Sequence, residues 1–105
     1  MFAQIITMTV PPGSIENLRT LITEEYLPQV INRPGFISAG LLEQVDDRNA
    51  TQLVIYWRSH QDVESANQTT GLAGSPYSIA ARIPGLRVQR HSYIVKISTE
   101  HALQL

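Results

Sequence analysis

The sequence predicts one α+β domain with its elements in the order β-α-β-β-α-β, and it predicts that two copies associate. Three observations lead to this prediction. Strand-like and helix-like patterns alternate along the 105 residues, a Pro-Gly motif follows each predicted helix, and the strands are apolar on both faces. Hydrophobic residues make up 43% of the chain, which is enough for a packed core. We expect residues 1–97 to form the domain and residues 98–105 to form a C-terminal tail.

The first strand and the first helix are predicted within the first third of the chain. Residues 2–10 are rich in β-branched and apolar side chains, and Pro11-Pro12-Gly13 ends this strand. Ser14 is a favourable N-cap, and apolar residues recur at helical spacing after it. Pro28 lacks the N–H of an interior helical hydrogen bond, so we expect the helix to kink or restart there. Pro34-Gly35 marks its end.

The next two strands are predicted to form a hairpin. Residues 36–45 and 50–58 have strand composition, and the polar residues 46–49 between them are typical of a turn. Ser59 and Asp62 then have the spacing of a capping pair, which predicts the start of a second helix.

The second helix is predicted to be interrupted. Gly71 and Gly74 break it, and Pro76, a residue favoured in a first turn, allows it to resume. Ile83-Pro84-Gly85 ends it, and residues 86–97 form a long last strand.

A weak internal repeat supports a ferredoxin-like arrangement. Arg33-Pro34-Gly35-Phe36 and Ile83-Pro84-Gly85-Leu86 each follow a predicted helix and open a predicted strand. Two βαβ halves of this kind form a four-stranded sheet with both helices on one face. The strands are too apolar to leave the other face in water, so we expect a homodimer.

Composition excludes several kinds of function. The net charge of −1 gives no general attraction for nucleic acid, and no apolar run is long enough to cross a membrane. The chain has no cysteine, which excludes disulfides and thiolate metal sites and fits a reducing compartment. The first residues lack the pattern of a signal peptide, so we expect a cytoplasmic protein. Phosphate-binding and nucleotide-binding motifs are also missing, and we expect no cofactor.

One stretch of the chain is basic. No acidic residue lies between Glu64 and Glu100, and four basic side chains fall there. Solvated strand and helix edges explain such a bias, and a site for an anionic or phenolate-like ligand explains it too. The four residues are Arg82, Arg87, Arg90 and Lys96.

Three short motifs resemble the antibiotic biosynthesis monooxygenase family. They are Pro34-Gly35-Phe36, Tyr56-Trp57-Arg58-Ser59 and Pro84-Gly85-Leu86, in the family's order and spacing, and the resemblance covers residues 2–97. It implies the dimeric α+β barrel fold, with an active pocket between sheet and helices and Trp57 facing the helices. Family members include cofactor-independent monooxygenases of polycyclic phenols and haem-degrading enzymes.

The chain departs from both kinds of enzyme. The prototype monooxygenase has an Asn, a Trp, a Tyr and an Arg where this sequence has Leu53, Trp57, Val63 and Tyr77, so one position of the four is kept.

The haem-degrading branch uses an Asn, a Trp and a His. The matching positions here are Ile6, Ala66 and about Pro76, which argues against haem degradation.

Three residues are candidates for catalysis. Trp57 could stack on a flat aromatic substrate, and Tyr77 could hydrogen-bond a phenolic or quinone oxygen. His91 is the best general-base candidate, because histidine titrates near neutral pH. The structural alternatives are a core Trp, a Tyr ring whose hydroxyl reaches water, and an interface or surface His.

Three further residues are candidates for substrate binding. Gln4 shares a strand face with apolar residues and needs a polar partner, which a neighbouring strand-end group could supply. Tyr26 could bind a substrate oxygen, and Leu53 occupies a matched pocket position. His60 and Glu64, spaced i, i+4, could share a metal, but two ligands are too few.

Three functions fit the sequence. The first is a cofactor-independent oxygenase that binds a small aromatic or phenolic molecule. The second is a small-molecule-binding or isomerase-like dimer that uses the same pocket. The third is an interaction module with a filled core. A cavity lined by Trp57 and Tyr77 would favour the first two, and a solid core would favour the third.

Overall fold

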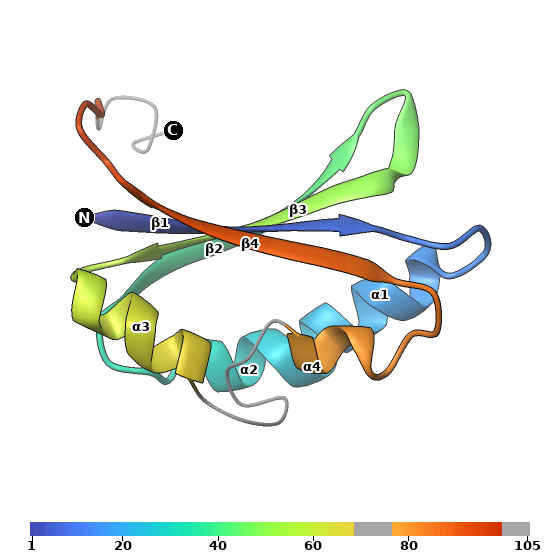
Figure 1. Ribbon diagram of the computed structural model, residues 1–105, viewed down its shortest axis with the longest axis horizontal. Helices are drawn as coiled ribbons and strands as arrows, with labels where there is room; N and C mark the ends of the chain where they lie inside the picture. Colours follow the sequence, from blue (N-terminus) through green and yellow to red (C-terminus); the bar gives the residue numbers. More distant parts are fainter. Residues whose placement is uncertain (69–76, 100–105) are drawn as a thin grey trace.

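The computed structural model describes residues 1–68 and 77–99, without the side chains of Gln68 and Tyr77, and forms a sheet with helices on one face (Figure 1). The four strands are antiparallel and lie in the order β2-β3-β1-β4. This confirms the predicted ferredoxin-like α+β fold. The strands are β1 (Phe2–Thr9), β2 (Phe36–Gln44), β3 (Asp47–Trp57) and β4 (Arg87–Ile94). The helical segments are α1 (Ile15–Leu21), η1 (Ile22–Tyr26), α2 (Leu27–Val30), α3 (His60–Gln68) and α4 (Tyr77–Ala80).

Two strand boundaries differ from the prediction by three residues, and the other boundaries agree to within one residue. β3 begins at Asp47 rather than at residue 50, because the turn is tighter than its polar composition suggests. β4 ends at Ile94 rather than at residue 97. Ile94 pairs with Phe2, the first residue of β1, so the chain beyond it has no further strand to pair with. The predicted break at Gly71 and Gly74 lies outside the described residues.

The first helix is continuous in space but changes its winding. A π-helical segment, η1, joins α1 to α2, and Pro28 lies in the first turn of α2. The restart at Pro28 is thus confirmed, whereas the π-helical turn was not predicted. Ser14 occupies the N-cap position of α1, but its side chain makes no capping hydrogen bond.

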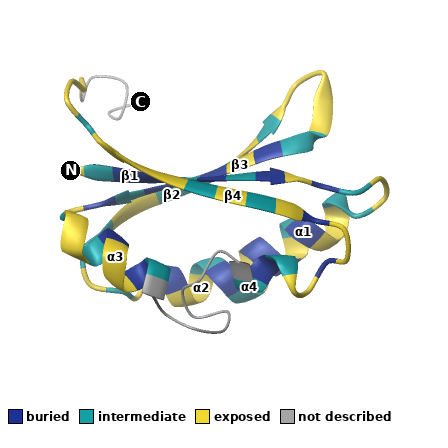
Figure 2. Ribbon diagram, viewed as in Figure 1, coloured by how far each residue is buried: buried dark blue, intermediate teal, exposed yellow. Residues whose placement is uncertain are grey.

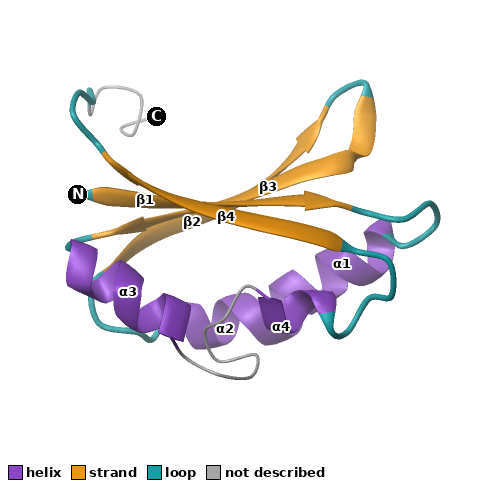
Figure 3. Ribbon diagram, viewed as in Figure 1, coloured by secondary structure: helices purple, strands orange, loops and turns teal. Residues whose placement is uncertain are grey.

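The helices cover one face of the sheet, and the core lies between the two layers (Figure 3). Side chains from alternate positions of β1 and β3 meet the apolar faces of the helices there. Trp57 belongs to this core and faces the helices, as the family resemblance implied. The buried members are Ile6, Met8, Val10, Leu18, Leu21, Ile22, Tyr26, Val30, Leu53, Ile55, Trp57, Val63, Ala66, Ile79, Ile83 and Leu86.

None of the described helices covers the opposite face of the sheet, which we call the open face (Figures 1 and 2). Its centre is apolar and small, since Ile5, Gly40 and Val54 lie side by side on neighbouring strands. The large apolar side chains Ile37 and Leu42 of β2 and the ring of Tyr93 are exposed. The open face is thus more apolar than a solvated sheet surface normally is.

Candidate functional site

A chain of polar side chains crosses the core between the sheet and α3. The indole Nε1–H of Trp57 donates a hydrogen bond to Gln4 Oε1 at 3.2 Å. The Gln4 amide Nε2–H in turn donates to Asn67 Oδ1 at 2.6 Å. Gln4 is only 1% exposed and Trp57 is fully buried. The two hydrogen bonds fix the orientation of the Gln4 amide and hold the indole against it.

Strand register explains how these residues meet. Gln4 is two positions from Phe2 and from Ile6, so its side chain faces the helices with theirs. Trp57 pairs with Phe2 on β1 and with Phe36 on β2, and the Phe36 ring meets the Trp57 ring edge-on at 6.1 Å. Asn67 lies on α3 and contacts Gln4 from the helix layer. The predicted need of Gln4 for a polar partner is therefore met twice, by Trp57 at the end of the neighbouring strand β3 and by Asn67 of α3.

The space between sheet and helices around Trp57 is filled. Trp57, Tyr26 and Leu53 are all at most 1% exposed and belong to one core cluster. Tyr26 and Leu53 were predicted to bind substrate in a pocket. In the part of the chain that the structure describes, they are instead buried in the core and line no open pocket. The reason is that the apolar side chains of the helices and strands fit together there.

Tyr26 is a buried phenol at the end of η1. Burial raises the pKa of the Tyr26 hydroxyl above its ordinary range, and the charge of Arg33 opposes this in part. The hydroxyl therefore stays protonated at neutral pH, which suits a hydrogen-bond donor and not a base.

The structure separates the predicted catalytic residues. His91 pairs with Ile5 and lies on the open face, whereas Trp57 faces the helices. Because neighbouring residues of a strand point to opposite faces, a base at His91 cannot reach a substrate beside Trp57. His91 lies near Tyr93, with ring centres 6.4 Å apart. Tyr77 opens α4, and its side chain is outside the described part.

A groove of about 300 Å³ opens between α3 and the end of β4, and we call it the α3–β4 groove. Its walls are largely apolar and aromatic. The imidazole of His60 lies 5.5 Å from the Phe2 ring, measured between ring centres. Phe2 is also the cross-strand neighbour of Trp57, so the groove reaches the row of side chains that contains Trp57. The lining residues are Phe2, His60, Ser92, Tyr93 and Ile94.

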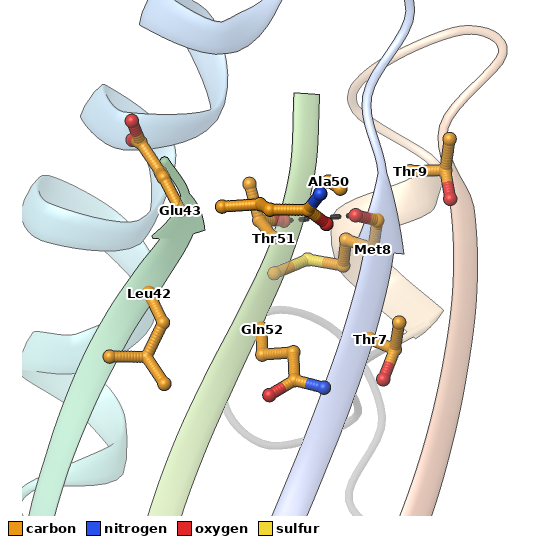
Figure 4. Close-up of a pocket in the computed structure, with 9 residues that line it drawn as sticks. Thr7, Met8, Thr9, Leu42, Glu43, Ala50, Thr51 and Gln52 are labelled. Atoms are coloured by element: carbon orange, nitrogen blue, oxygen red, sulfur yellow. Dashed lines mark hydrogen bonds between the residues drawn. The ribbon is translucent and has the colours of Figure 1, made fainter. Parts of the chain in front are cut away.

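A second hollow, of about 360 Å³, lies mainly on the open face near the β2–β3 hairpin (Figure 4). Threonine and glutamine side chains supply most of its polar groups. Thr51 donates a hydrogen bond to the backbone oxygen of Met8 at 3.0 Å. Glu43, at its edge, is held by Arg19 of α1, and this hydrogen bond lowers the pKa of the Glu43 carboxyl. These groups offer binding contacts but no unpaired base.

Neither Asn67 nor a role for His60 in a groove was predicted from the sequence. Asn67 lies near the end of α3. It follows the buried Ala66 and stands four residues after the buried Val63, and this spacing places it near the inner face of α3. Within the described residues, no three His, Asp or Glu side chains gather as a metal site. None of the helices that the structure describes is long and apolar enough to span a membrane.

Comparison with known families gives one match. Residues 1–73 match the family model described as antibiotic biosynthesis monooxygenase. The comparison with curated protein sequences gives no significant match.

Several solved structures share the fold at low sequence identity. SnoaB, a cofactor-independent oxygenase from Streptomyces nogalater, is 15% identical with a TM-score of 0.76, covering 92% of this chain and 94% of that one. MhuD, a heme-degrader from Mycobacterium tuberculosis, is 21% identical with a TM-score of 0.68, covering 94% and 99%. A conserved protein from Methanosarcina mazei is 9% identical with a TM-score of 0.73, covering 91% and 94%. At these identities the likeness concerns the fold alone.

Proposed function

This chain belongs to the antibiotic biosynthesis monooxygenase family, and on that basis we propose that it is a cofactor-independent monooxygenase of a small aromatic or phenolic substrate. Within the family the fold is shared by proteins of different activity, such as the oxygenase SnoaB and the heme-degrader MhuD. The residues of the site must therefore support the choice of reaction.

The buried chain from Trp57 through Gln4 to Asn67 is the observation that carries this proposal. Burying an amide in an apolar core costs free energy unless the amide forms hydrogen bonds. Here Trp57 and Asn67, from two other elements, form hydrogen bonds with the Gln4 amide. Trp57 is the one residue, of the four compared, that this sequence shares with the prototype monooxygenase. The haem branch receives no such support, because Ile6 and Ala66 occupy two of its positions.

We place the substrate in the α3–β4 groove, beside the core that contains Trp57. A volume of about 300 Å³ is at the lower end of ordinary ligand pockets and suits a small aromatic molecule. Phe2 offers a ring surface to a flat substrate. Phe2 is also the cross-strand neighbour of Trp57, so a substrate in the groove would lie beside the strand ends that carry Trp57.

The reaction we propose converts a phenol to a quinone. The phenol loses its O–H hydrogen and one ring C–H hydrogen, and that ring carbon gains one oxygen atom from dioxygen. The other oxygen atom leaves with the two hydrogens as water, so the phenol is oxidised and dioxygen is reduced. The protein would bind and orient the phenol and favour its anion, which gives up an electron more readily.

Oxygen uptake in buffer without added cofactor and with a chelator tests this function. A panel of simple phenols, dihydroxynaphthalenes and polycyclic phenols would be compared with the rate without protein. We expect faster uptake with at least one phenol, and one isotopically labelled oxygen atom from dioxygen in the quinone product. Uptake at the protein-free rate across the panel would refute the oxygenase assignment.

A second candidate is a non-catalytic dimer that binds a small molecule or another protein. The filled core around Trp57, Tyr26 and Leu53 favours this candidate. It predicts that a phenol binds without being consumed, or does not bind. Titration of the Trp57 fluorescence with the same panel would separate these outcomes.

We also propose that the working form is a homodimer joined through the open face, and that it acts in the cytoplasm. The exposed apolar side chains of β2 and β4 support the first proposal. The absence of cysteine from the chain supports a reducing compartment.

A further inference from the structure

We infer that His60, oriented by Glu64, is the base that takes the proton from a phenol bound in the α3–β4 groove. The inference rests on the proposed function, because it names the proton acceptor for that reaction. It also replaces His91, which lies on the other face of the sheet.

His60 is held in place from two sides. Its Nε2 lies 3.2 Å from Glu64 Oε1, one helical turn further along α3. Its ring lies against Phe2, at 5.5 Å between centres and tilted by 39°. In the neutral imidazole one nitrogen donates and the other accepts, so a Nε2–H directed at Glu64 leaves the lone pair on Nδ1.

The arrangement resembles the usual pairing of a histidine base with a carboxylate that orients it. A carboxylate hydrogen-bonded to one nitrogen stabilises the imidazolium that forms when the other nitrogen accepts a proton. The His60 side chain is 61% exposed and that of Glu64 is 48% exposed, so the ion pair alone adds little stability. In the groove, the role of Glu64 is to orient the His60 ring.

Among the residues that the structure describes, few other groups near His60 titrate. Glu64 is its charged neighbour on α3, and Tyr93 lines the same groove from β4. Phe2, the side chain that faces it from β1, is uncharged. The remaining lining residues, Ser92 and Ile94, are not bases at neutral pH.

The proton transfer balances within the groove. The phenol O–H bond breaks, a new N–H bond forms at His60 Nδ1, and the electron pair stays on the phenolate oxygen. The imidazolium and the phenolate then attract each other at the apolar, partly enclosed wall formed by Phe2 and Ile94. The phenolate is the species that transfers an electron to dioxygen, the oxidant of the proposed reaction.

Binding of 4-nitrophenol tests the proton transfer without any oxidation. Its phenolate absorbs visible light and its neutral form does not, so absorbance reports the deprotonated fraction. At a pH near its own pKa we expect the bound probe to be more deprotonated than the free probe. Without such an increase in the wild-type protein, the inference is wrong.

Matched histidine variants locate the base. His60→Gln should abolish the increase in phenolate, whereas His91→Gln makes the same change on the opposite face and should leave it intact. Circular dichroism and sedimentation would verify that both variants fold and assemble like the wild type. Equal loss in the two variants, or no loss in His60→Gln, would overturn the assignment.

Turnover provides a second measurement if the oxygenase is active. His60→Gln should lower kcat by roughly 100-fold, in the range of general-base catalysis, and should remove the acid limb of the pH profile. Glu64→Gln keeps a hydrogen-bonding partner but loses the charge, so kcat should fall by a smaller factor. An intact acid limb in His60→Gln would contradict the inference. A nitrophenol response without oxygen uptake would instead refute the oxygenase and leave the base assigned.

Discussion

Trp57 combines two roles in one side chain, since it fills the core and donates a hydrogen bond to Gln4. Replacing it with alanine removes a large buried side chain, whereas phenylalanine keeps most of the apolar volume. Phenylalanine nevertheless leaves the Gln4 oxygen without its indole donor, and an unsatisfied buried polar group is costly. The two substitutions therefore separate packing from hydrogen bonding.

We predict that Trp57→Ala lowers the free energy of unfolding by roughly 3–5 kcal/mol, and that Trp57→Phe lowers it by about 1–3 kcal/mol. Urea denaturation followed by circular dichroism would measure both. If Trp57 also acts in the oxygenase, Trp57→Phe should lose turnover while remaining folded. An alanine variant as stable as the wild type would show that the ring is not part of the core.

A prediction about pH concerns Tyr26. Burial raises the pKa of its hydroxyl in the folded state. Tyr26 therefore contributes stability that is fully present below the ordinary tyrosine pKa of about 10 and is lost as the pH rises above it. The free energy of unfolding should therefore decline less steeply between roughly pH 9 and 11 in Tyr26→Phe than in the wild type. Equal slopes in the two proteins would contradict the prediction.

The sequence predicted single residues well where periodicity decides them. Strand alternation placed Gln4 beside the apolar residues of β1, and the family resemblance placed Trp57 on the helix face. The second partner of Gln4 could not be predicted, because Asn67 lies 63 residues away and meets it only after α3 packs on the sheet. The α3–β4 groove was missed for the same reason, since it combines residues 2, 60 and 92–94.

At the scale of elements, the two serines that precede helices differ in their contacts. Ser59 accepts a hydrogen bond from the Asp62 backbone N–H at 3.2 Å and donates one to the Asp62 carboxylate at 2.8 Å. Ser14 makes no side-chain cap. The sequence predicted a cap at both, because residue type and spacing do not reveal the rotamer.

This contrast gives a matched pair of variants. Ser59→Ala should lower the free energy of unfolding by about 1 kcal/mol, because two hydrogen bonds at the start of α3 are lost. Ser14→Ala should change it by only a few tenths of that value, about 0.3 kcal/mol or less, because no side-chain bond is lost. Chemical denaturation of the two variants in parallel would compare them. Similar losses in both would mean that Ser14 caps α1 in solution.

The helical segments also show the limits of a pattern. Apolar residues at helical spacing predicted one helix that kinks or restarts at Pro28, and a new helical segment, α2, does begin there with Pro28 in its first turn. The π-helical turn of η1 escaped prediction because Leu18, Ile22 and Tyr26 fit the spacing of an ordinary α-helix equally well. Which winding forms depends on how these side chains meet the sheet.

At the scale of the whole molecule, the open face is the surface that exposes large apolar side chains to water. Exposed large apolar side chains lie on both edge strands, β2 and β4, and water solvates such a surface poorly. A second copy placed sheet on sheet would bury these side chains and the small apolar centre between them. The arrangement leaves the α3–β4 groove on the helix side.

We predict that the protein sediments at twice the monomer mass at low micromolar concentration. Val54→Glu, which places a charge in the centre of the open face of each copy, should shift the equilibrium toward monomer. Glu24→Gln on the exposed side of the first helix is a control that should leave the dimer intact. A wild-type protein that sediments as a monomer would refute this assembly.

The π-helical turn has a consequence for the history of this chain. A π-type hydrogen-bonded ring encloses one residue more than an α-type ring, so the segment behaves like a helix that has accepted a single-residue insertion. A relative one residue shorter between Ile22 and Tyr26 should form an unbroken α-helix over the same sheet. We therefore expect single-residue length differences among relatives to accumulate here, where the fold absorbs them in one turn.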